Sequence, residues 1–484
     1  MTLTTSQKLV NKLWRFCDVL RDDGLSYPDY VEQLTYLLFL KMAQERRDDM
    51  FALVVPDDIG WGSLVNKRGT ELHLQYGRIL KQLAQKSGML GLVFRRAENK
   101  IKDPRKLQKL VVDLIDRDWW SSFDIDIKGE AYEGLLHKTS EDSKSGAGQY
   151  FTPRPLIDAI VRVVQPRLGE TVCDPACGTG GFLISSHKFI LSAGRRLKSK
   201  DHKFLKLRAY RGVELVDSVA RLAAMNLLLH GIGTNVETDR TPIEIRDSLS
   251  SAPNEQFDVV LTNPPFGRKS AISIKLEGDQ RSESANSRSD FIAASNNKQV
   301  NFIQHVVSLL KPGGRAAVIV PDNVLFESGA AETVRRFLLT NCNLHTILRL
   351  PTGIFYAQGV KASVLFFDRV SPPADANDVW TYDLRSHKKY SLRNNPLTSD
   401  DLTEFVSSCI SAQQKRGSSR NGVAERWYPL NRSRLLAAPS ARLDFECKAK
   451  TTIHGNLSAR QLGTQIESDL REALKSIQFV TRRL

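Results

Sequence analysis

The chain has 484 residues, too many for one ordinary hydrophobic core, which predicts two or three domains. With 41% hydrophobic and 25% charged residues, the composition is that of a soluble globular protein and argues against a disordered or membrane-spanning one. The 69 basic residues outnumber the 54 acidic ones, and the net charge of +15 favours a polyanionic partner.

From the N-terminus and the cysteines we expect a cytoplasmic protein with no metal site. Residues 1–9 lack the charged-then-apolar layout of a signal peptide, and the apolar run 36–40 is far shorter than the ~20 residues that span a bilayer. The six cysteines form no repeated Cys-x-x-Cys pair, which suits neither zinc nor a disulfide framework. Cys173 and Cys177, the closest pair, are expected to be small buried residues.

Residues 1–140 predict a helical N-terminal domain. Apolar side chains recur at helical spacing within 10–20 and 31–42, and further helical stretches follow around 71–85 and 104–116. We expect the apolar stripes of these helices to form the core of the domain.

Residues 141–375 predict a second domain of the α/β class, because short apolar strands alternate with helices such as 155–164 and 217–229. The predicted strands are 171–173, 210–213, 257–261, 316–320, 344–350 and 362–367. The alternation is typical of a Rossmann-like, mostly parallel sheet with helices on both faces.

Two segments do not fit the alternating pattern. Residues 268–299 are polar, basic and rich in serine, and predict a flexible surface loop, for which DNA contact and a plain insertion are both open. The strand pattern fades after about residue 370, so 376–484 is predicted to be a C-terminal extension. It ends in an amphipathic helix around 462–477, which packs on its own core or on a partner subunit.

A glycine-rich turn follows the first predicted strand of the sheet, which ends at Asp174. The turn consists of Gly178, Thr179, Gly180 and Gly181. Glycines let a ligand approach the backbone closely, whereas simple helix–strand packing is the alternative. A second strand ends at Glu214, where a carboxylate commonly accepts hydrogen bonds from ribose hydroxyls. Asp247 either closes the adenine end of the cofactor or caps its own turn.

The motifs that bind phosphates are absent from this turn. The sequence has no Gly-x-Gly-x-x-Gly at this position and no Lys-Ser/Thr ending. The turn therefore favours a nucleoside cofactor without a pyrophosphate, such as S-adenosylmethionine.

A short motif precedes the sheet and reads Gln149, Tyr150, Phe151, Thr152, Pro153 and Arg154. We expect Thr152 to cap a helix that starts at one of the two following residues. The position suggests a lid on the cofactor, with Phe151 as an apolar wall; a capped helix without further function is the alternative.

The predicted strand 257–261 leads into Asn263, Pro264, Pro265 and Phe266. Two prolines make this turn stiff, and the Pro264 carbonyl stays available to a ligand. The exocyclic amine of adenine is a poor nucleophile because its lone pair is delocalised into the ring. Hydrogen bonds to the Asn263 side-chain oxygen and to that carbonyl would localise the lone pair, while stacking on Phe266 is worth ~1–3 kcal/mol.

The two turns together predict methyl transfer from a sulfonium to adenine by in-line displacement. No metal is needed, and the base must first flip out of the duplex, at a cost of about a few kcal/mol. A rigid surface turn is the alternative for 263–266, but its position at the end of a buried strand favours the chemistry.

These motifs resemble those of N6-adenine DNA methyltransferases, with 174–182 as the cofactor motif and 263–266 as the catalytic one. More narrowly, the chain resembles the modification subunit of type I restriction-modification systems. Residues 149–154, 310–317 and 350–355 carry this narrower resemblance, which covers the chain from 10 to about 370. It implies the fold of S-adenosylmethionine-dependent methyltransferases.

The resemblance also implies roles for individual residues. Cofactor binding falls on 149–154, 179–181 and Glu214, and catalysis on Asn263, Pro264 and Phe266. Phe355 either stacks beside the flipped base or is a core aromatic residue.

The partners that the resemblance implies are double-stranded DNA, a specificity subunit, a second copy of this chain and a motor-nuclease subunit. Only about 110 residues follow the sheet, fewer than the ~150 of a typical recognition domain, so another chain is expected to supply sequence specificity. The alternatives are a solitary sequence-specific methyltransferase, a catalytically silent DNA-binding or assembly subunit, and a methyltransferase acting on glutamine in protein.

Overall fold

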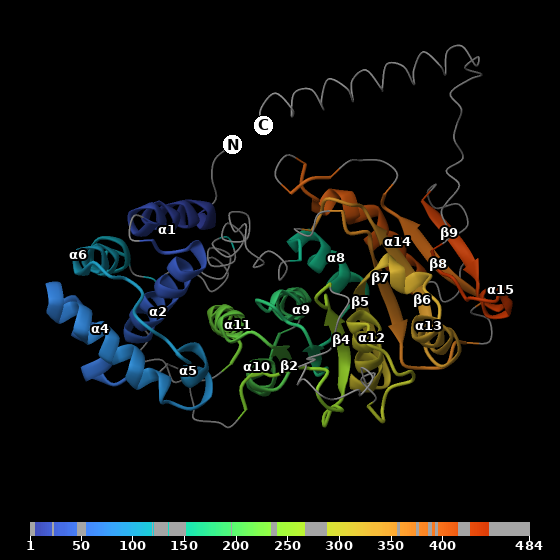
Figure 1. Cartoon of the computed structure of the whole chain (residues 1–484), viewed down its shortest axis with the longest axis horizontal. Coiled ribbons are helices and arrows are strands. Elements are labelled where there is room, and N and C mark those ends of the chain that lie inside the picture. Colours follow the sequence, from blue (N-terminus) through green and yellow to red (C-terminus); the bar gives the residue numbers. More distant parts are fainter. Residues whose placement is uncertain are drawn as a thin grey trace, which may run out of the picture. The chain divides into compact units, whose positions relative to one another are not determined.

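A computed structural model describes most of the chain up to residue 444 (Figure 1). The described residues are 5–21, 24–45, 55–118, 120, 134, 152–194, 196–233, 240–266, 288–355, 359–373, 377–385, 390–392, 395–414 and 426–444. Contacts between residues divide the chain into two units, Met1–Leu443 and Asp444–Leu484, and the elements below belong to the first. The domain boundaries at 140 and 375 stay predictions.

The N-terminal region is helical, as the sequence predicts. Its helices are α1 (Thr5–Arg21), α2 (Tyr27–Glu45), η1 (Asp57–Ile59), α3 (Gly62–Val65), α4 (Gly69–Ala84), α5 (Gly88–Val93), α6 (Pro104–Gln108) and the π-helix η2 (Lys109–Ile115). In α4, Leu72, Tyr76, Ile79 and Leu83 recur every three or four residues and are fully buried. None of the described helices is long and apolar enough to cross a membrane.

The described part of the chain contains one large sheet. Its strands are β1 (Val172–Asp174), β2 (Tyr210–Glu214), β3 (Ile243–Ile245), β4 (Phe257–Thr262), β5 (Leu310–Pro321), β6 (Asn343–Leu350), β7 (Ala362–Asp368), β8 (Asp378–Asp383) and β9 (Trp427–Asn431). They are ordered β3-β2-β1-β4-β5-β7-β6-β8-β9. β7 is antiparallel to both its neighbours and β9 to β8, while the other pairs are parallel.

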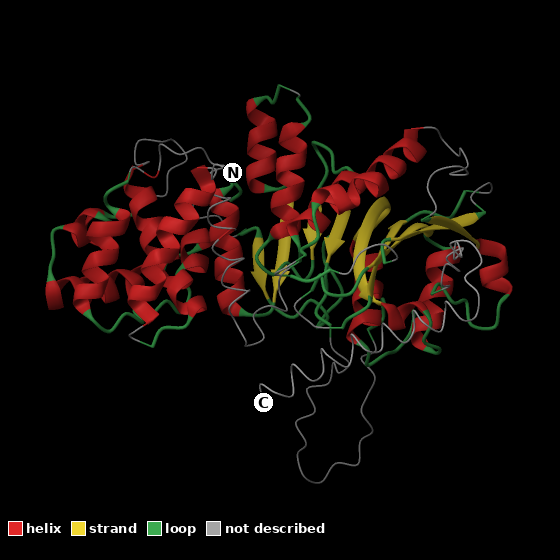
Figure 2. Cartoon of the chain, turned by 90° about the horizontal axis from the view of Figure 1, so that it is seen from above, coloured by secondary structure: helices red, strands yellow, loops and turns green. Residues whose placement is uncertain are grey.

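Helices cover both faces of this sheet (Figure 2). They are α8 (Arg154–Val164), α9 (Gly181–Ser192), α10 (Ser199–Leu207), α11 (Asp217–Leu229), α12 (Lys298–Leu309), η5 (Asp322–Leu325), α13 (Ala330–Thr340), α14 (Ser399–Gln414) and α15 (Arg432–Ala437). Val259 packs into the apolar cluster that holds α8, α9, α11 and α14, whereas Val260 packs into the one that holds α12, α13 and α15. The alternation of strand side chains thus supplies both cores.

Two expectations about the less regular segments are corrected by the structure. The strand pattern does not stop near residue 370, because β8 and β9 extend the sheet by two strands. Residues 288–297 are ordered: Asn301 donates to the Ser295 carbonyl at 2.8 Å, and Gln304 donates to the Ala293 carbonyl at 3.0 Å. The rest of the predicted loop and the predicted C-terminal helix lie outside the described residues.

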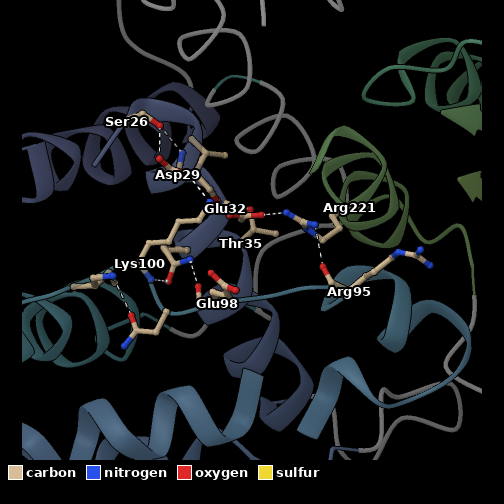
Figure 3. A network of polar contacts seen from close by, with 12 residues as sticks. Ser26, Asp29, Glu32, Thr35, Arg95, Glu98, Lys100 and Arg221 are labelled. Carbon is tan, nitrogen blue, oxygen red and sulfur yellow. Dashed lines mark hydrogen bonds and ion pairs between the residues drawn. The ribbon is translucent and has the colours of Figure 1, made fainter. Parts of the chain in front are cut away.

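An ionic network joins the helical region to α11 (Figure 3). The Arg221 guanidinium pairs with Glu32 and donates to the Arg95 carbonyl at 2.9 Å. Lys100 approaches the other oxygen of Glu32 at 2.8 Å. The Arg221 and Glu32 side chains are only 9% and 10% exposed, so the largely buried Glu32 charge depends on Arg221 and Lys100 for compensation.

Candidate active site

The carboxyl ends of β2, β1 and β4 lie next to one another, because these three strands are adjacent and parallel. They end at Glu214, Asp174 and Thr262. The predicted cofactor turn after β1 and the predicted catalytic turn after β4 therefore occupy the same edge of the sheet, where α/β folds bind ligands.

The glycine-rich turn after β1 rests on helix α11. Gly178 and Gly180 have φ values of +52° and +84°, a backbone conformation that favours glycine. A Cβ at Gly180 would also lie 2.9 Å from Leu227 Cδ1. Beside it, Asn226 Nδ2 donates to the Thr179 carbonyl at 2.9 Å. Asn226 was not predicted from the sequence, because its partner lies 47 positions away.

Two buried carboxylates flank this turn. Glu214 accepts hydrogen bonds from the backbone N–H groups of Val216 at 2.9 Å and Gly178 at 3.1 Å. Asp174 accepts one from Ala176 N–H at 3.0 Å. Burial raises the pKa of Asp174 to about 7, an increase to which the Glu214 charge adds. Burial also raises the pKa of Glu214.

Leu215, directly after the Glu214 carboxylate, is a large apolar side chain that is 63% exposed. It was not predicted as a site residue. The sequence pattern that could have indicated it is an apolar residue directly after a carboxylate at the end of a strand. Because Leu215 is exposed at the edge of the sheet, it offers an apolar surface to a ligand.

The side-chain amide of Asn263 is hydrogen-bonded at one end and has no partner among the described residues at the other. Its Nδ2 donates to Thr152 Oγ1 at 2.9 Å. Its Oδ1 is buried and has no hydrogen-bond partner among the described residues. The Pro265 carbonyl accepts from Gln299 Nε2 at 3.1 Å, whereas no described donor reaches the Pro264 carbonyl. Two acceptors at the end of β4 are thus unused by the described protein.

The helix cap expected from Thr152 is not present. Helix α8 begins at Arg154, and Pro153 is its N-cap residue without a side-chain capping bond. The Thr152 hydroxyl instead accepts the hydrogen bond from Asn263, a contact between residues 111 positions apart. Arg154 approaches Asp158 on the same helix at 3.4 Å.

The structure brings together two aromatic residues that the sequence singles out separately. The Phe266 and Phe355 rings meet edge to face, with centroids 5.7 Å apart and an interplanar angle of 83°. Phe355 is 6% exposed and forms part of the core, and its role beside a flipped base stays a prediction.

The remaining predicted site residues either make no described contact with the two turns or lie outside the described residues. Asp247 is exposed and its Oδ1 accepts from Leu249 N–H at 2.9 Å, which is the turn-capping alternative; its cofactor role stays a prediction. Gln149, Tyr150 and Phe151 lie outside the described residues. In the part of the chain that is described, no cluster of His, Cys, Asp or Glu is suited to a metal ion.

The strand order, the antiparallel β7 and the glycine turn between two strand-end carboxylates define the class of S-adenosylmethionine-dependent methyltransferases. The predicted fold class is therefore confirmed.

Comparison with known proteins identifies the family within this class. Residues 123–438 match the N-6 DNA Methylase family, and residues 9–114 match the HsdM N-terminal domain. The methylase subunit of the type I restriction enzyme StySPI of Salmonella potsdam is 36% identical over 98% of this chain and 95% of its own. The chain thus belongs to the methylase subunits of type I restriction enzymes, which are adenine-specific DNA methyltransferases, as the sequence predicts.

Two solved structures agree with this family. A chain from a study of the assembly and conformational transition of a type I restriction-modification system has a TM-score of 0.76 and 28% identity, with 99% of this chain and 98% of that one covered. A modification subunit assigned to a type I restriction enzyme of Vibrio vulnificus has a TM-score of 0.72 and 25% identity, with 90% and 94% covered.

Proposed function

We propose that Asn263 and Pro264 activate the N6 amine of a flipped adenine for methyl transfer from S-adenosylmethionine. The observation that carries this proposal is the Asn263 side chain, whose Nδ2 is anchored on Thr152 while its buried Oδ1 has no partner among the described residues. A buried acceptor without a donor is costly, by about 1–3 kcal/mol, and a ligand N–H would satisfy it.

The chemistry follows from the two acceptors. The amine has two N–H groups, and Asn263 Oδ1 and the Pro264 carbonyl accept one each. This withdraws the nitrogen lone pair from the ring and makes it available for in-line attack on the methyl carbon. The N–C bond would form as the C–S bond breaks, and the sulfur would leave as the neutral thioether S-adenosylhomocysteine. Proton loss then follows the transfer, so no strong general base is required.

The aromatic pair supports the proposal by offering a surface to the base. Phe266 is half-buried and its ring is fixed by edge contact with Phe355. A base stacked on such a ring gains ~1–3 kcal/mol, which offsets part of the cost of flipping.

The residues at the ends of β1 and β2 fit the proposed cofactor. S-adenosylmethionine supplies an electrophilic methyl group on a positively charged sulfur. Asp174 and Glu214 are buried carboxylates with no basic ion-pair partner among the described residues, and they suit a cationic ligand that carries a ribose diol. The exposed Leu215 beside them suits its adenine. We keep residues 149–154 and Asp247 as further proposed contacts on the basis of the family resemblance.

We further propose that the chain acts with a specificity subunit, double-stranded DNA, a second copy of itself and a motor-nuclease subunit. The names of its relatives support an assembly of this type, and the net charge of +15 supports a polyanionic substrate. A solitary enzyme that reads DNA itself predicts instead that the purified chain alone methylates specific sites.

The test is transfer of labelled methyl groups to DNA by the chain co-purified with its neighbouring gene products. Asn263→Ala is expected to lower the rate by about 100-fold or more while cofactor affinity stays within about twofold. Asn66→Ala, which alters an exposed asparagine in the helical region, is the matched control. Full activity of Asn263→Ala, or label recovered in protein glutamine rather than in N6-methyladenine, contradicts the proposal.

A further inference from the structure

The geometry points to Arg385 as a positioning residue for the target base, because it donates hydrogen bonds to both ends of the loop that carries Phe355. This inference rests on the proposed function, in which Phe355 and Phe266 form the wall beside the flipped adenine. Arg385 follows β8, in the part of the chain that was predicted to be a C-terminal extension.

The first contact of Arg385 is a bidentate ion pair with Asp322, which lies 63 positions earlier in the sequence. Nη1 lies 2.8 Å from Oδ2, and Nη2 donates to Oδ1 at 2.8 Å. Such a planar pair fixes orientation as well as distance. The side chains are 19% and 12% exposed, so the pair is largely shielded from water. Ser363 also donates to Asp322, at 3.0 Å, which fixes the carboxylate in turn.

The second set of contacts reaches the loop itself. Arg385 Nε donates to the Leu350 carbonyl at 2.9 Å, and Nη2 donates to the Ala362 carbonyl at 3.0 Å. Leu350 is the last residue of β6 and Ala362 the first of β7, so one guanidinium holds the two ends of the segment 351–361.

The loop also lies directly against the chain that follows Arg385. Gly353 has a φ of +86°, and a Cβ at this position would lie 2.2 Å from the Tyr390 carbonyl oxygen. Only glycine allows this backbone approach. Gly353 is two residues before Phe355, so the segment after β8 supports the loop at its ends and near its aromatic residue.

The strand directions place this support at the catalytic edge. β5 is parallel to β4, β7 is antiparallel to β5 and to β6, and β8 is parallel to β6. The ends of β5, β6 and β8 and the start of β7 therefore lie on the same edge as Asn263. Arg385 touches none of the proposed reacting groups and acts through the loop.

The test measures base flipping by the co-purified complex on its own methylation site, with 2-aminopurine at the target adenine. Arg385→Gln is expected to lower the 2-aminopurine fluorescence that reports base flipping and to raise KM for DNA about tenfold. The cofactor affinity is expected to stay within about twofold of wild type. Arg385→Lys keeps the positive charge but loses the planar guanidinium, and it is expected to show most of the loss in base flipping. A mispaired target base, which costs less to flip, is expected to restore both variants.

Arg336→Gln is the matched control, because Arg336 also pairs with one carboxylate, Glu332, and donates to backbone carbonyls near α15. It is expected to leave flipping unchanged. Normal flipping by both Arg385 variants overturns the inference, as does a loss that is equal for paired and mispaired targets. Asn263→Ala distinguishes the two proposals. Full activity of this variant contradicts the proposed function. If this variant flips the base but does not transfer the methyl group, the proposed function stands and the Arg385 variants test the further inference.

Discussion

The Asn263 amide is anchored by Thr152, whose hydroxyl oxygen accepts a hydrogen bond from Nδ2 at 2.9 Å. In this arrangement the acceptor end of the amide, Oδ1, has no hydrogen-bond partner among the described residues. A primary amide offers a donor at one end and an acceptor at the other, and only the acceptor suits an incoming amine. Thr152 thereby links the segment before the sheet to the proposed chemistry.

Removing the anchor should lower the catalytic rate. Thr152→Val keeps the shape but leaves Asn263 Nδ2 without its partner, at a cost of about 1–3 kcal/mol, so we expect kcat to fall about tenfold or more. Thr152→Ser retains the hydroxyl and should stay close to wild type. Rates from single-turnover methyl transfer provide the measurement, and a fully active valine variant would show that the anchor is dispensable.

The support under the glycine turn should control cofactor affinity. Asn226→Asp keeps the size of the side chain but removes the donor to the Thr179 carbonyl, and Asn226→Leu removes the polar group altogether. We expect both to weaken cofactor binding by about tenfold, which corresponds to ~1.4 kcal/mol. Calorimetric titration with S-adenosylhomocysteine tests this, alongside melting temperatures. Unchanged affinity in both variants would contradict the expectation.

Cofactor binding should depend on pH through Asp174. Burial raises its pKa to about 7, so in the cofactor-free protein the group is largely protonated below that value. A cation bound beside it favours the carboxylate, so affinity should rise by up to about tenfold per unit from about pH 5 to 7 and level off above. Calorimetry in two buffers measures whether cofactor binding releases a proton, which tests whether the deprotonation of Asp174 causes the pH dependence.

The same shift has the opposite sign for stability. Because the pKa of Asp174 is higher in the folded state than its ordinary value of 3.8, the cofactor-free fold takes up a proton and is stabilised as pH falls through about 7 towards 4. Asp174→Asn should remove both dependences. A pH-independent affinity in the wild-type protein would rule out this role.

The two aromatic rings should act as a unit. Phe266→Ala is expected to weaken productive DNA binding by the ~1–3 kcal/mol of a lost stacking contact, while Phe266→Tyr retains it. Combining Phe266→Ala with Phe355→Leu should give less than the sum of the single effects, because the rings touch each other. KM for DNA and the flipping signal of 2-aminopurine report this coupling, and strict additivity would argue for independent roles.

The ionic network between the helical region and α11 should matter for stability. Arg221→Gln leaves the Glu32 charge without its buried partner, and we expect the free energy of unfolding to fall by about 3–5 kcal/mol. Lys67→Gln, which removes an exposed pair with Glu71, is the control and should cost at most ~1 kcal/mol. Denaturant titration distinguishes the two, and equal losses would contradict the assignment.

Acid should weaken this network in a defined direction. Burial alone raises the pKa of Glu32, but Arg221 and Lys100 outweigh burial and hold it below its ordinary value of 4.5. The stabilisation is therefore present above about pH 4.5 and is lost as the pH falls through the lower folded-state pKa. Glu32→Gln should abolish that part of the acid sensitivity.

Most of the elements that build the sheet were predictable. Each of the six predicted strands overlaps an observed one, and the predicted helix 217–229 matches α11. β3, β8 and β9 were missed, because β3 has three residues and the other two carry polar residues or a proline that weaken the alternation. The turns after β1 and β4 could be located from the sequence because each follows its strand within a few residues, and their catalytic and cofactor roles stay predictions.

The amino-acid sequence by itself determined the fold class, the family and the two turns, because strand periodicity, glycine and proline act over short stretches of chain. Only the tertiary structure decided that Thr152 anchors Asn263, that Phe355 meets Phe266, and that Arg385 fastens a loop between β6 and β7. These contacts join residues tens of positions apart, and their partners are selected by strand order and direction, which local patterns do not encode.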